Sequence, residues 1–253
     1  MRQLSFGESV RRASKRNSTR TVLALDLEDK DRSALIKRCE KLLSEVSDQI
    51  CAVKINRQLI LALGLTGGVD LIVDFAHSLS LPTIIDAKLN DVAHTNASMT
   101  RAYLECGFDA IIASPIVGWE YGLDSVFELV NNTEKSIILL VHMSNPGSEK
   151  FYSLMVADTR TPIFERFAEL ALRWKAHGVV VGATNLDVVS RVRAIVGDEI
   201  QIYSPGVGAQ GGDGRRAIEA GANYIIVGRS IYSSSDPSKS ARQIRFMTME
   251  KRS

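Results

Sequence analysis

Eight short runs of apolar and β-branched residues, separated by segments of helical periodicity, constrain the fold of this chain most. The runs are continuous rather than alternating, which is typical of parallel strands that are covered by helices. Between the first two runs, residues 32–47 carry apolar side chains at helical spacing. The pattern therefore predicts a repeated strand–helix unit. The eight predicted strands are residues 21–26, 51–55, 82–89, 109–114, 136–143, 178–183, 201–206 and 223–228.

The regular alternation favours one domain, although 253 residues would also suffice for two. Eight such units without a linker predict a single α/β domain, a (β/α)8 TIM barrel over residues 1–253. An open, doubly wound sheet is the alternative, but residues 26–29 after the first strand hold no GxGxxG motif. Two long connections, 144–161 and 206–213, are expected at the C-terminal face of the barrel as lids or ligand clamps.

The charge is distributed unevenly along the chain, which a net charge of +2 conceals. Residues 1–20 sum to +5 and residues 239–253 to +4, so the rest of the chain sums to −7. We predict a basic N-terminal helical extension over 1–20 and a basic C-terminal helix end over 239–253, both as solvated helix faces. A non-catalytic barrel that binds nucleotide or nucleic acid through these ends is an alternative. It is disfavoured because no aromatic residues are interleaved with the basic ones, so no nucleic-acid partner is expected.

Cysteine use and hydropathy bear on the compartment. The three cysteines form no CxxC motif and cannot all pair, which favours reduced thiols and a cytoplasmic protein. No uninterrupted apolar run of about 18 residues occurs, so no membrane association is expected. The cysteines are Cys39, Cys51 and Cys106.

The histidines give no sign of a metal site. They fall on separate segments without the spacing of metal ligands, so each is predicted to be satisfied by hydrogen bonds or exposed, and no metal is predicted. Asp86 and Asp91 could still hold a magnesium ion. The four histidines are His77, His94, His142 and His177.

Charged residues at the ends of the predicted strands are the most informative feature for function. Asp26 ends the first strand, Lys54 the second, and Asp86 and Lys88 the third, while Asp91 follows at the start of the next helix. Asp86 and Lys88 are two residues apart, so on an extended segment both side chains point to the same face. Burying such charges is costly unless they pair or act chemically. These residues therefore predict an active site at the barrel mouth.

Phosphate-binding signals lie on the last two predicted strands. Residues 205–212 are rich in glycine, so their backbone amides can approach an anion closely. Gly228 and Arg229 follow the eighth strand, where Arg229 can hold a phosphate in a bidentate fork. The loops after strands seven and eight are the usual phosphate site of this fold. The residues thus indicate a barrel enzyme that acts on a small phosphorylated molecule through a Lys/Asp network.

The segment 86–95, an Asp-x-Lys-x-x-Asp motif followed by a threonine, resembles the orotidine 5′-phosphate decarboxylase family in its compact, single-function form. Further matching segments occur in order over residues 20–235, at 24–26, 53–54, 143–147, 204–206 and 227–229. The resemblance implies cofactor-free decarboxylation of orotidine 5′-monophosphate to uridine 5′-monophosphate in pyrimidine biosynthesis.

The resemblance also implies roles for individual residues. The charge network around the departing carboxylate would comprise Lys54, Asp86, Lys88 and Asp91, with Lys88 as proton donor. Asp91 and Thr95 would reach into the site of a partner subunit, so a homodimer is implied. The substrate nucleotide would be held at its ribose, pyrimidine and phosphate by Asp26, Thr95, Ser144, Pro205, Gln210, Gly228 and Arg229.

A related barrel enzyme that acts on a keto-sugar phosphate through a magnesium-stabilised enediolate is the main alternative. Such relatives share the Asp-x-Lys-x-x-Asp motif but have a carboxylate where Lys54 stands. An ammonium group at that position would repel the metal ion. Lys54 therefore favours the decarboxylase.

Overall fold

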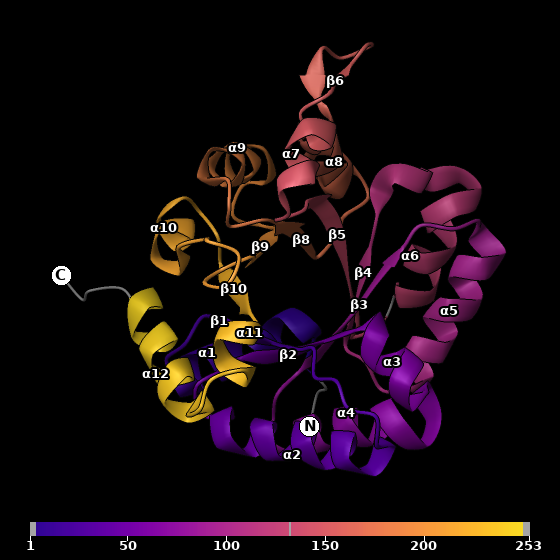
Figure 1. Ribbon diagram of the computed structural model, residues 1–253. Helices are drawn as coiled ribbons and strands as arrows, with labels where there is room; N and C mark the ends of the chain where they lie inside the picture. Colours follow the sequence, from indigo (N-terminus) through magenta and orange to yellow (C-terminus); the bar gives the residue numbers. More distant parts are fainter. Residues whose placement is uncertain (1–3, 132, 250–253) are drawn as a thin grey trace.

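The computed structural model, which describes residues 4–131 and 133–249, is a closed barrel of parallel strands surrounded by helices (Figure 1). The strands follow one another around the barrel in the order β1-β10-β9-β8-β5-β4-β3-β2. The predicted (β/α)8 barrel and its eight strands are confirmed. The barrel strands are β1 (Thr21–Leu25), β2 (Ala52–Asn56), β3 (Thr83–Leu89), β4 (Ala110–Ala113), β5 (Ser136–His142), β8 (Gly178–Val181), β9 (Gln201–Pro205) and β10 (Tyr224–Val227).

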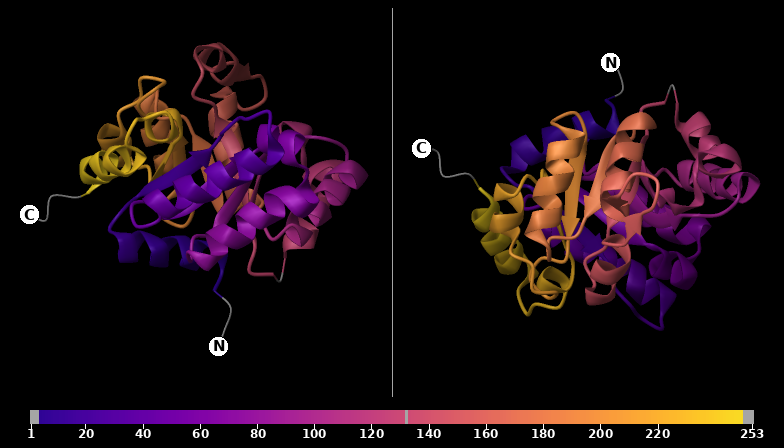
Figure 2. Two further views of the ribbon diagram at one scale, coloured as in Figure 1. Left: turned by 60° about the horizontal axis from the view of Figure 1, so that its bottom comes forward. Right: turned by 90° about the horizontal axis from the view of Figure 1, so that it is seen from above.

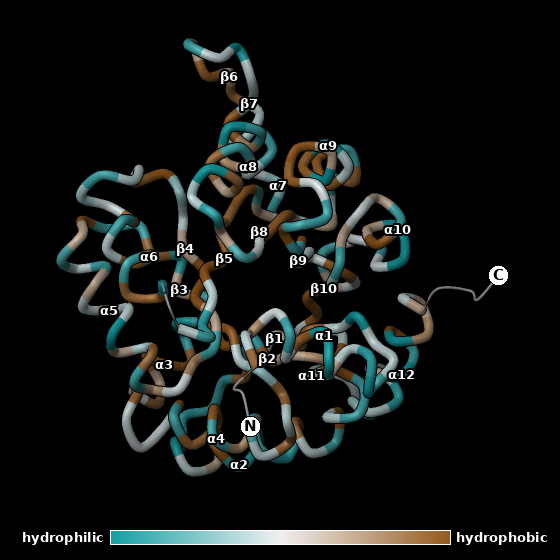
Figure 3. The backbone as a smooth tube through the Cα atoms, turned by 180° about the vertical axis from the view of Figure 1, so that it is seen from behind, coloured by the Kyte–Doolittle hydropathy of each residue, from teal (hydrophilic) through white to brown (hydrophobic). Residues whose placement is uncertain are grey.

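Helices cover the outside of the barrel, and the main apolar core lies between them and the strands. In Figure 3 the strands lie in the middle of the molecule, and the helices and the more hydrophilic loops surround them. The α-helices are α1 (Phe6–Asn17), α2 (Arg32–Val46), α3 (Arg57–Leu63), α4 (Asp70–Ser78), α5 (Ala93–Glu105), α6 (Asp124–Val130), α7 (Pro146–Tyr152), α8 (Ile163–Arg173), α9 (Leu186–Val196), α10 (Gly214–Glu219), α11 (Arg229–Tyr232) and α12 (Pro237–Thr248). Shorter helical turns are η1 (Leu65–Val69), η2 (Pro115–Val117) and η3 (Trp119–Leu123).

Strand periodicity decides which side chains face the barrel interior. In β2, Val53 and Ile55 belong to the outer core beneath the helices, whereas Ala52 belongs to the cluster inside the barrel. Because side chains alternate along a strand, Lys54 also points inward, one layer nearer the C-terminal end. The barrel thus carries its charged residues above an apolar interior layer.

Helix α1 closes the N-terminal end of the barrel (Figure 2, beside the N label). Phe6 and Val10 are buried in the interior cluster, where the ring of Phe6 lies 6.4 Å from that of Tyr203. Ser5 and Glu8 form a capping box that begins the helix. The prediction of a merely solvated basic helix is therefore wrong for one face of α1, because its apolar side chains seal the barrel.

The basic C-terminal segment forms the greater part of α12. Ala241 and Thr248 are buried, and the helix packs against α2, α10 and α11. The last residues of the predicted segment, 250–253, lie outside the described residues. One face of α12 is therefore part of the fold; Lys239 and Arg242 are exposed, whereas Arg245 Nη1 donates to the buried Gln49 at 3.1 Å.

The connection after β5, predicted as a long loop over 144–161, contains regular structure. Helix α7 occupies its first half, and β6 (Met155–Val156) pairs antiparallel with β7 (Thr161–Pro162) in its second half. The hairpin projects from the body of the molecule at the top of Figure 1. The long connection was predicted, but its helix and hairpin were not, since two-residue strands are too short to show a periodic pattern.

The three cysteines are free and buried, as predicted. Burial raises the pKa of Cys39 to about 12 and that of Cys106 to about 11, and it raises the pKa of Cys51 further. These thiols are therefore small buried side chains without thiolate character.

The described residues contain no single helix long and apolar enough to cross a membrane. By length and composition alone, the bent pair Arg57–Leu63 and Leu65–Ser78 passes the same test, with an angle of 91° between its halves. Both halves bury apolar residues against the barrel, among them Leu59 and Ile72.

Candidate active site

A cavity of about 220 Å³ opens at the C-terminal end of the barrel strands. Its floor consists of apolar side chains from four strands, Ile112, Leu140, Val180 and Ile226. Most of the predicted site residues line its walls together. These are Asp26, Lys54, Asp86, Lys88, Ser144, Pro205, Gln210, Gly228 and Arg229.

One carboxylate lies between two ammonium groups at the wall formed by β2 and β3. Lys54 Nζ donates to Asp86 Oδ2 at 2.9 Å, and Lys88 Nζ donates to Asp86 Oδ1 at 2.6 Å. Lys54 and Asp86 are only 5% and 8% exposed, so the pair is screened from water on most sides. Each ammonium group has three protons and uses one on Asp86, which leaves donors for a bound molecule.

The two lysines keep Asp86 ionised. Burial alone would raise the pKa of its carboxyl, but the charges of Lys54 and Lys88 and their hydrogen bonds together hold that pKa below its ordinary value. The site therefore holds a net positive charge spread over three closely spaced groups. Such an arrangement is suited to a substrate on which negative charge develops.

The backbone at Lys88 is left-handed, with φ +47°, and the β3–β4 register shifts between Ile85 and Leu89. The side chains of Asp86 and Lys88 do meet, as predicted, but not because the segment is extended. The bulge turns the chain, and the Lys88 side chain still meets Asp86. A non-glycine residue in this region costs of order 1 kcal/mol or more, and such residues cluster at functional sites.

Beside this wall, at the end of the neighbouring strand β1, Asp26 presents an unsatisfied acceptor. Its Oδ1 atom is buried and has no hydrogen-bond partner among the described residues. Burial, followed by the charge of Asp26, raises the pKa of the neighbouring Tyr232. A buried carboxylate oxygen without a donor is costly, so this atom is suited to accept a hydrogen bond from a ligand hydroxyl.

Two polar side chains of the cavity wall, Asn56 and Tyr232, were not predicted. Asn56 lies two residues after Lys54 on β2, and Tyr232 lies three after Arg229 on α11. Both follow a predicted residue at the spacing that keeps side chains on one face, two in a strand and three in a helix. Extending the predicted set by that rule would have found them.

The glycine-rich loop is anchored to the end of β5. Gly206 has φ +95°, and a Cβ there would lie 2.7 Å from Ser144 Cβ, so only glycine lets the two segments approach. Across this contact Ser144 Oγ donates to Gln210 Oε1 at 2.7 Å. The loop after β9 and the strand end after β5 therefore form one wall of the cavity.

Four backbone amides of the same loop donate to other groups of the protein. Those of Gly208, Gly211 and Gly212 donate to loop carbonyls, and that of Ala209 donates to Ser230 Oγ. The amides of Gly208, Gly211 and Gly212 are therefore already engaged, and anion binding by the backbone of this loop stays a prediction. Anion donors that face the cavity include the Arg229 guanidinium, which is exposed, together with the Gln210 carboxamide NH₂.

Asp91 and Thr95 lie outside this cavity. Asp91 is exposed, and its Oδ1 accepts from the amide of Val92 at 2.7 Å, while Thr95 lies on the first turn of α5. The side chain of Val92 is 51% exposed beside them. These residues thus do not line the cavity of their own chain.

His142 departs from its predicted state. It is 1% exposed, and neither ring nitrogen has a hydrogen-bond partner among the described residues, although Nε2 lies 3.6 Å from Glu149 Oε2. Burial lowers its pKa, so the ring is neutral near pH 7.

Within the described part of the chain, no group of three or more His, Cys, Asp or Glu side chains could hold a metal ion.

The fold and the cavity define a class of protein, a (β/α)8 barrel with a lysine–aspartate site at its C-terminal mouth. Residues 19–244 match the family described as orotidine 5′-phosphate decarboxylase / HUMPS. The chain belongs to this family. The resemblance seen in the sequence is thereby confirmed, and with it the expectation of an enzyme of the carboxy-lyase class.

Curated relatives and a solved structure agree with this assignment. The chain is 39% identical over 223 residues to the orotidine 5′-phosphate decarboxylase of Pyrococcus abyssi, covering 88% of this chain and 96% of that protein. It is 37% identical to that of Methanosarcina acetivorans, covering 90% and 93%. The crystal structure of orotidine 5′-monophosphate decarboxylase from Methanocaldococcus jannaschii matches with a TM-score of 0.76 and 28% identity, over 92% of this chain and 99% of that one.

Proposed function

We propose that the protein decarboxylates orotidine 5′-monophosphate to uridine 5′-monophosphate, without a cofactor. The observation that carries this proposal is the pair of ammonium groups held on Asp86 at 2.6 and 2.9 Å, at the wall of a cavity with an apolar floor. The family assignment and the names of the curated relatives support it.

The reaction needs stabilisation of a carbanion. When the bond between C6 and the carboxyl carbon breaks, CO₂ leaves and the electron pair stays on C6, with no adjacent carbonyl to delocalise it. A fixed ammonium group beside C6 stabilises this charge as it forms. Lys88 then transfers a proton from Nζ to C6, which gives the product. Lys54 holds Asp86 in place, and Asp86 repels the substrate carboxylate and orients Lys88.

The phosphate supplies binding energy far from the reacting carbon. In this proposal Arg229, Gln210 and Gly228 hold the phosphate, Ser144 contacts the pyrimidine edge, and Pro205 shapes the wall. Asp26 accepts from a ribose hydroxyl through its unsatisfied oxygen. Because the phosphate is not altered, its contacts stabilise ground and transition states together. We therefore expect Arg229→Ala to raise KM by about 10- to 100-fold, as steady-state kinetics would measure.

The activity is tested by incubating purified, EDTA-treated protein with orotidine 5′-monophosphate and following the loss of its ultraviolet absorbance. We expect turnover that EDTA does not reduce. Strict dependence on magnesium together with activity on a keto-sugar phosphate would identify the alternative enediolate enzyme and overturn the proposal. If the protein turns over neither substrate, the proposal is also overturned.

We further propose a homodimer in which Asp91 and Thr95 complete the partner's site. Both lie outside the cavity of their own chain, and exposed apolar side chains, Val92 and Ile116, occupy the neighbouring connections. Such side chains are typical of an interface. Cytoplasmic localisation stays a prediction from the sequence.

Mixing two inactive variants tests the shared site. Lys88→Ala and Asp91→Ala each disable both sites of a homodimer, but a heterodimer of the two contains one intact site. Subunit exchange between equal amounts should restore about a quarter of the wild-type activity, since half of the dimers are mixed. If the mixture stays inactive although heterodimers form, Asp91 acts in its own subunit and the shared site is excluded.

A further inference from the structure

A second cavity, of about 310 Å³, lies at the N-terminal end of the barrel, opposite the mouth. Helix α1 forms one wall, through residues spaced so that they share one helix face. The end of α4, the turn into β3 and the start of β4 form the other wall. The lining residues are Leu4, Ser9, Arg12, Ala13, Arg16, His77, Ser80, Leu81, Pro82 and Asp109.

Two guanidinium groups stand one helical turn apart on this wall. Arg16 is held in place, because its Nη2 donates to the carbonyls of Leu79 at 3.4 Å and Ser80 at 3.3 Å. Arg12 is exposed, and it makes no hydrogen bond or ion pair to the residues at 4–131 and 133–249. One cation of the cavity is thus fixed by the fold, and the other is left for a ligand.

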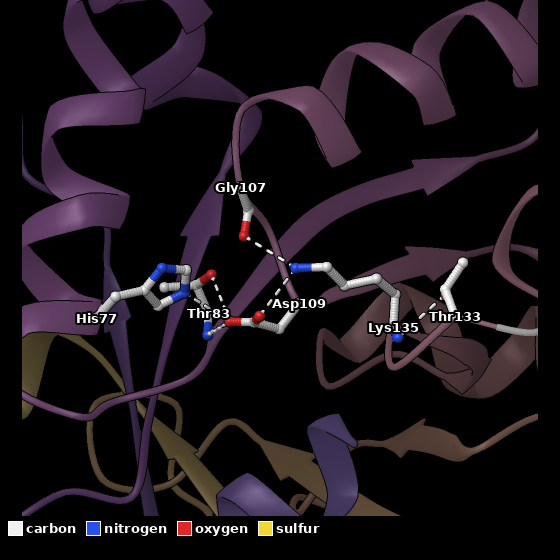
Figure 4. Close-up of polar contacts among 6 residues, drawn as sticks. All are labelled: His77, Thr83, Gly107, Asp109, Thr133 and Lys135. Atoms are coloured by element: carbon white, nitrogen blue, oxygen red, sulfur yellow. Dashed lines mark hydrogen bonds and ion pairs between the residues drawn. The ribbon is translucent and has the colours of Figure 1, made fainter. Parts of the chain in front are cut away.

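The cavity's carboxylate, Asp109, is neutralised by other groups (Figure 4). Its Oδ2 accepts from Thr83 N at 2.8 Å and lies 2.7 Å from His77 Nε2, and its Oδ1 accepts from Lys135 Nζ at 3.0 Å. Although burial alone would raise its pKa, the His77 hydrogen bond and the Lys135 charge keep that pKa below its ordinary value. Asp109 therefore needs nothing from Arg12, and the cavity stays cationic.

We propose that this cavity binds a small phosphate monoester. The dianion contacts the guanidinium groups of Arg12 and Arg16, whose planar forks match phosphate oxygens. The hydroxyls of Ser9 and Ser80 can donate to the remaining oxygens, and Leu81 and Pro82 offer a wall for a short carbon chain. The volume is that of a small-ligand site.

The site goes beyond the proposed decarboxylation and is independent of it. The family match begins at residue 19, whereas α1 ends at Asn17, so one wall comes from a segment outside the matched region. This explains the basic character of the N-terminal segment, which the active site does not use. The ligand would occupy the end of the barrel opposite the catalytic mouth.

Histidine ring NMR during titration with glycerol 3-phosphate tests the proposal locally. His77 lines this cavity, and His177, which lines a different cavity at the same end of the barrel, is an internal reference. We expect a saturable shift of the His77 signals, assigned with His77→Gln, and no shift with glycerol. Arg12→Ala should weaken binding by about 10-fold or more, because it removes a charge-assisted contact.

The matched control is Lys15→Ala, which removes the same charge from α1 at an exposed residue outside the cavity. It should bind glycerol 3-phosphate like the wild type. The proposal is overturned if the His77 signals do not respond, if glycerol shifts them equally, or if both variants lose the same affinity. Equal loss would mean diffuse attraction to a basic helix. An unchanged melting temperature without ligand would establish that Arg12→Ala keeps the fold.

Discussion

The two ends of the barrel each carry an aspartate held by a lysine, yet the hydrogen-bond partners of the two carboxylates differ. At the mouth, the hydrogen bonds that Asp86 receives from the described residues come from two ammonium groups. At the closed end, Asp109 is bonded to a lysine, a histidine, a hydroxyl and a backbone amide. Both aspartates have lowered pKa values, so charge by itself does not distinguish them.

The difference lies in the unused donors. Around Asp109 the partners are themselves tied to the fold, as when Lys135 Nζ also donates to the carbonyl of Gly107 at 3.3 Å. Around Asp86 each lysine makes its one side-chain hydrogen bond within the described residues to that carboxylate and faces an open cavity. A perturbed carboxylate marks a functional site when its partners retain free donors, and a structural one when they do not.

The largest expected difference between the two ends follows from removing one lysine from each. Lys88→Ala should lower kcat by about 10⁴-fold or more, because it removes both the charge beside the carbanion and the proton donor. Lys135→Ala should leave kcat within about twofold, because the Lys135–Asp109 ion pair lies away from the active site and affects only the free energy of unfolding. Steady-state kinetics on both variants, at matched folded fractions, measures the contrast. Comparable losses of kcat would contradict the division between the two ends.

A smaller effect is expected from neutralising the structural aspartate. Asp109→Asn keeps the side-chain shape but leaves Lys135 and His77 without their anion, so the free energy of unfolding should fall by about 2 kcal/mol. Urea denaturation measures this change. If the variant is as stable as the wild type, the Asp109 cluster does not stabilise the fold.

The smallest effect is the acid dependence of stability. Both aspartates have folded-state pKa values below the ordinary 3.8, so their contribution is complete above that value. Below it the unfolded chain takes up protons first, and each group lowers the free energy of unfolding by up to about 1.4 kcal/mol per pH unit. Denaturation between pH 5 and 2.5 should show this loss, with a shallower slope in Asp109→Asn. An equal slope would mean that Asp109 is not the titrating group.

The strands could be predicted because parallel strands between helices are rich in apolar residues, and each of the eight runs contains adjacent apolar side chains. Likewise, Asp26, Lys54 and Asp86 stand out because a charge at the end of such a run has few structural explanations. The grouping of these residues in one cavity follows from the closed barrel, which brings all strand ends together.

The remaining features depend on contacts between distant parts of the chain. The Asp109 cluster joins residues of α4 and β3 with residues of the connections before β4 and β5, and no local pattern links His77 to Lys135. The unsatisfied ring of His142 results from burial that only the folded barrel creates. The sealing role of α1 could have been predicted, since Phe6, Val10 and Ala13 lie on one helix face. The prediction considered only the positive charge of this segment.

The helix that seals the barrel also affects the order of folding. Helix α1 is synthesised before the barrel strands, but its buried face rests on strands that include β9 and β10, where Tyr203 stacks on Tyr224. Contacts between such distant segments form late, because the whole intervening loop must first be closed. The first helix therefore has no complete docking surface until the last strand is in place. A fluorescent probe on α1 would accordingly report closure of the barrel, and not the beginning of collapse.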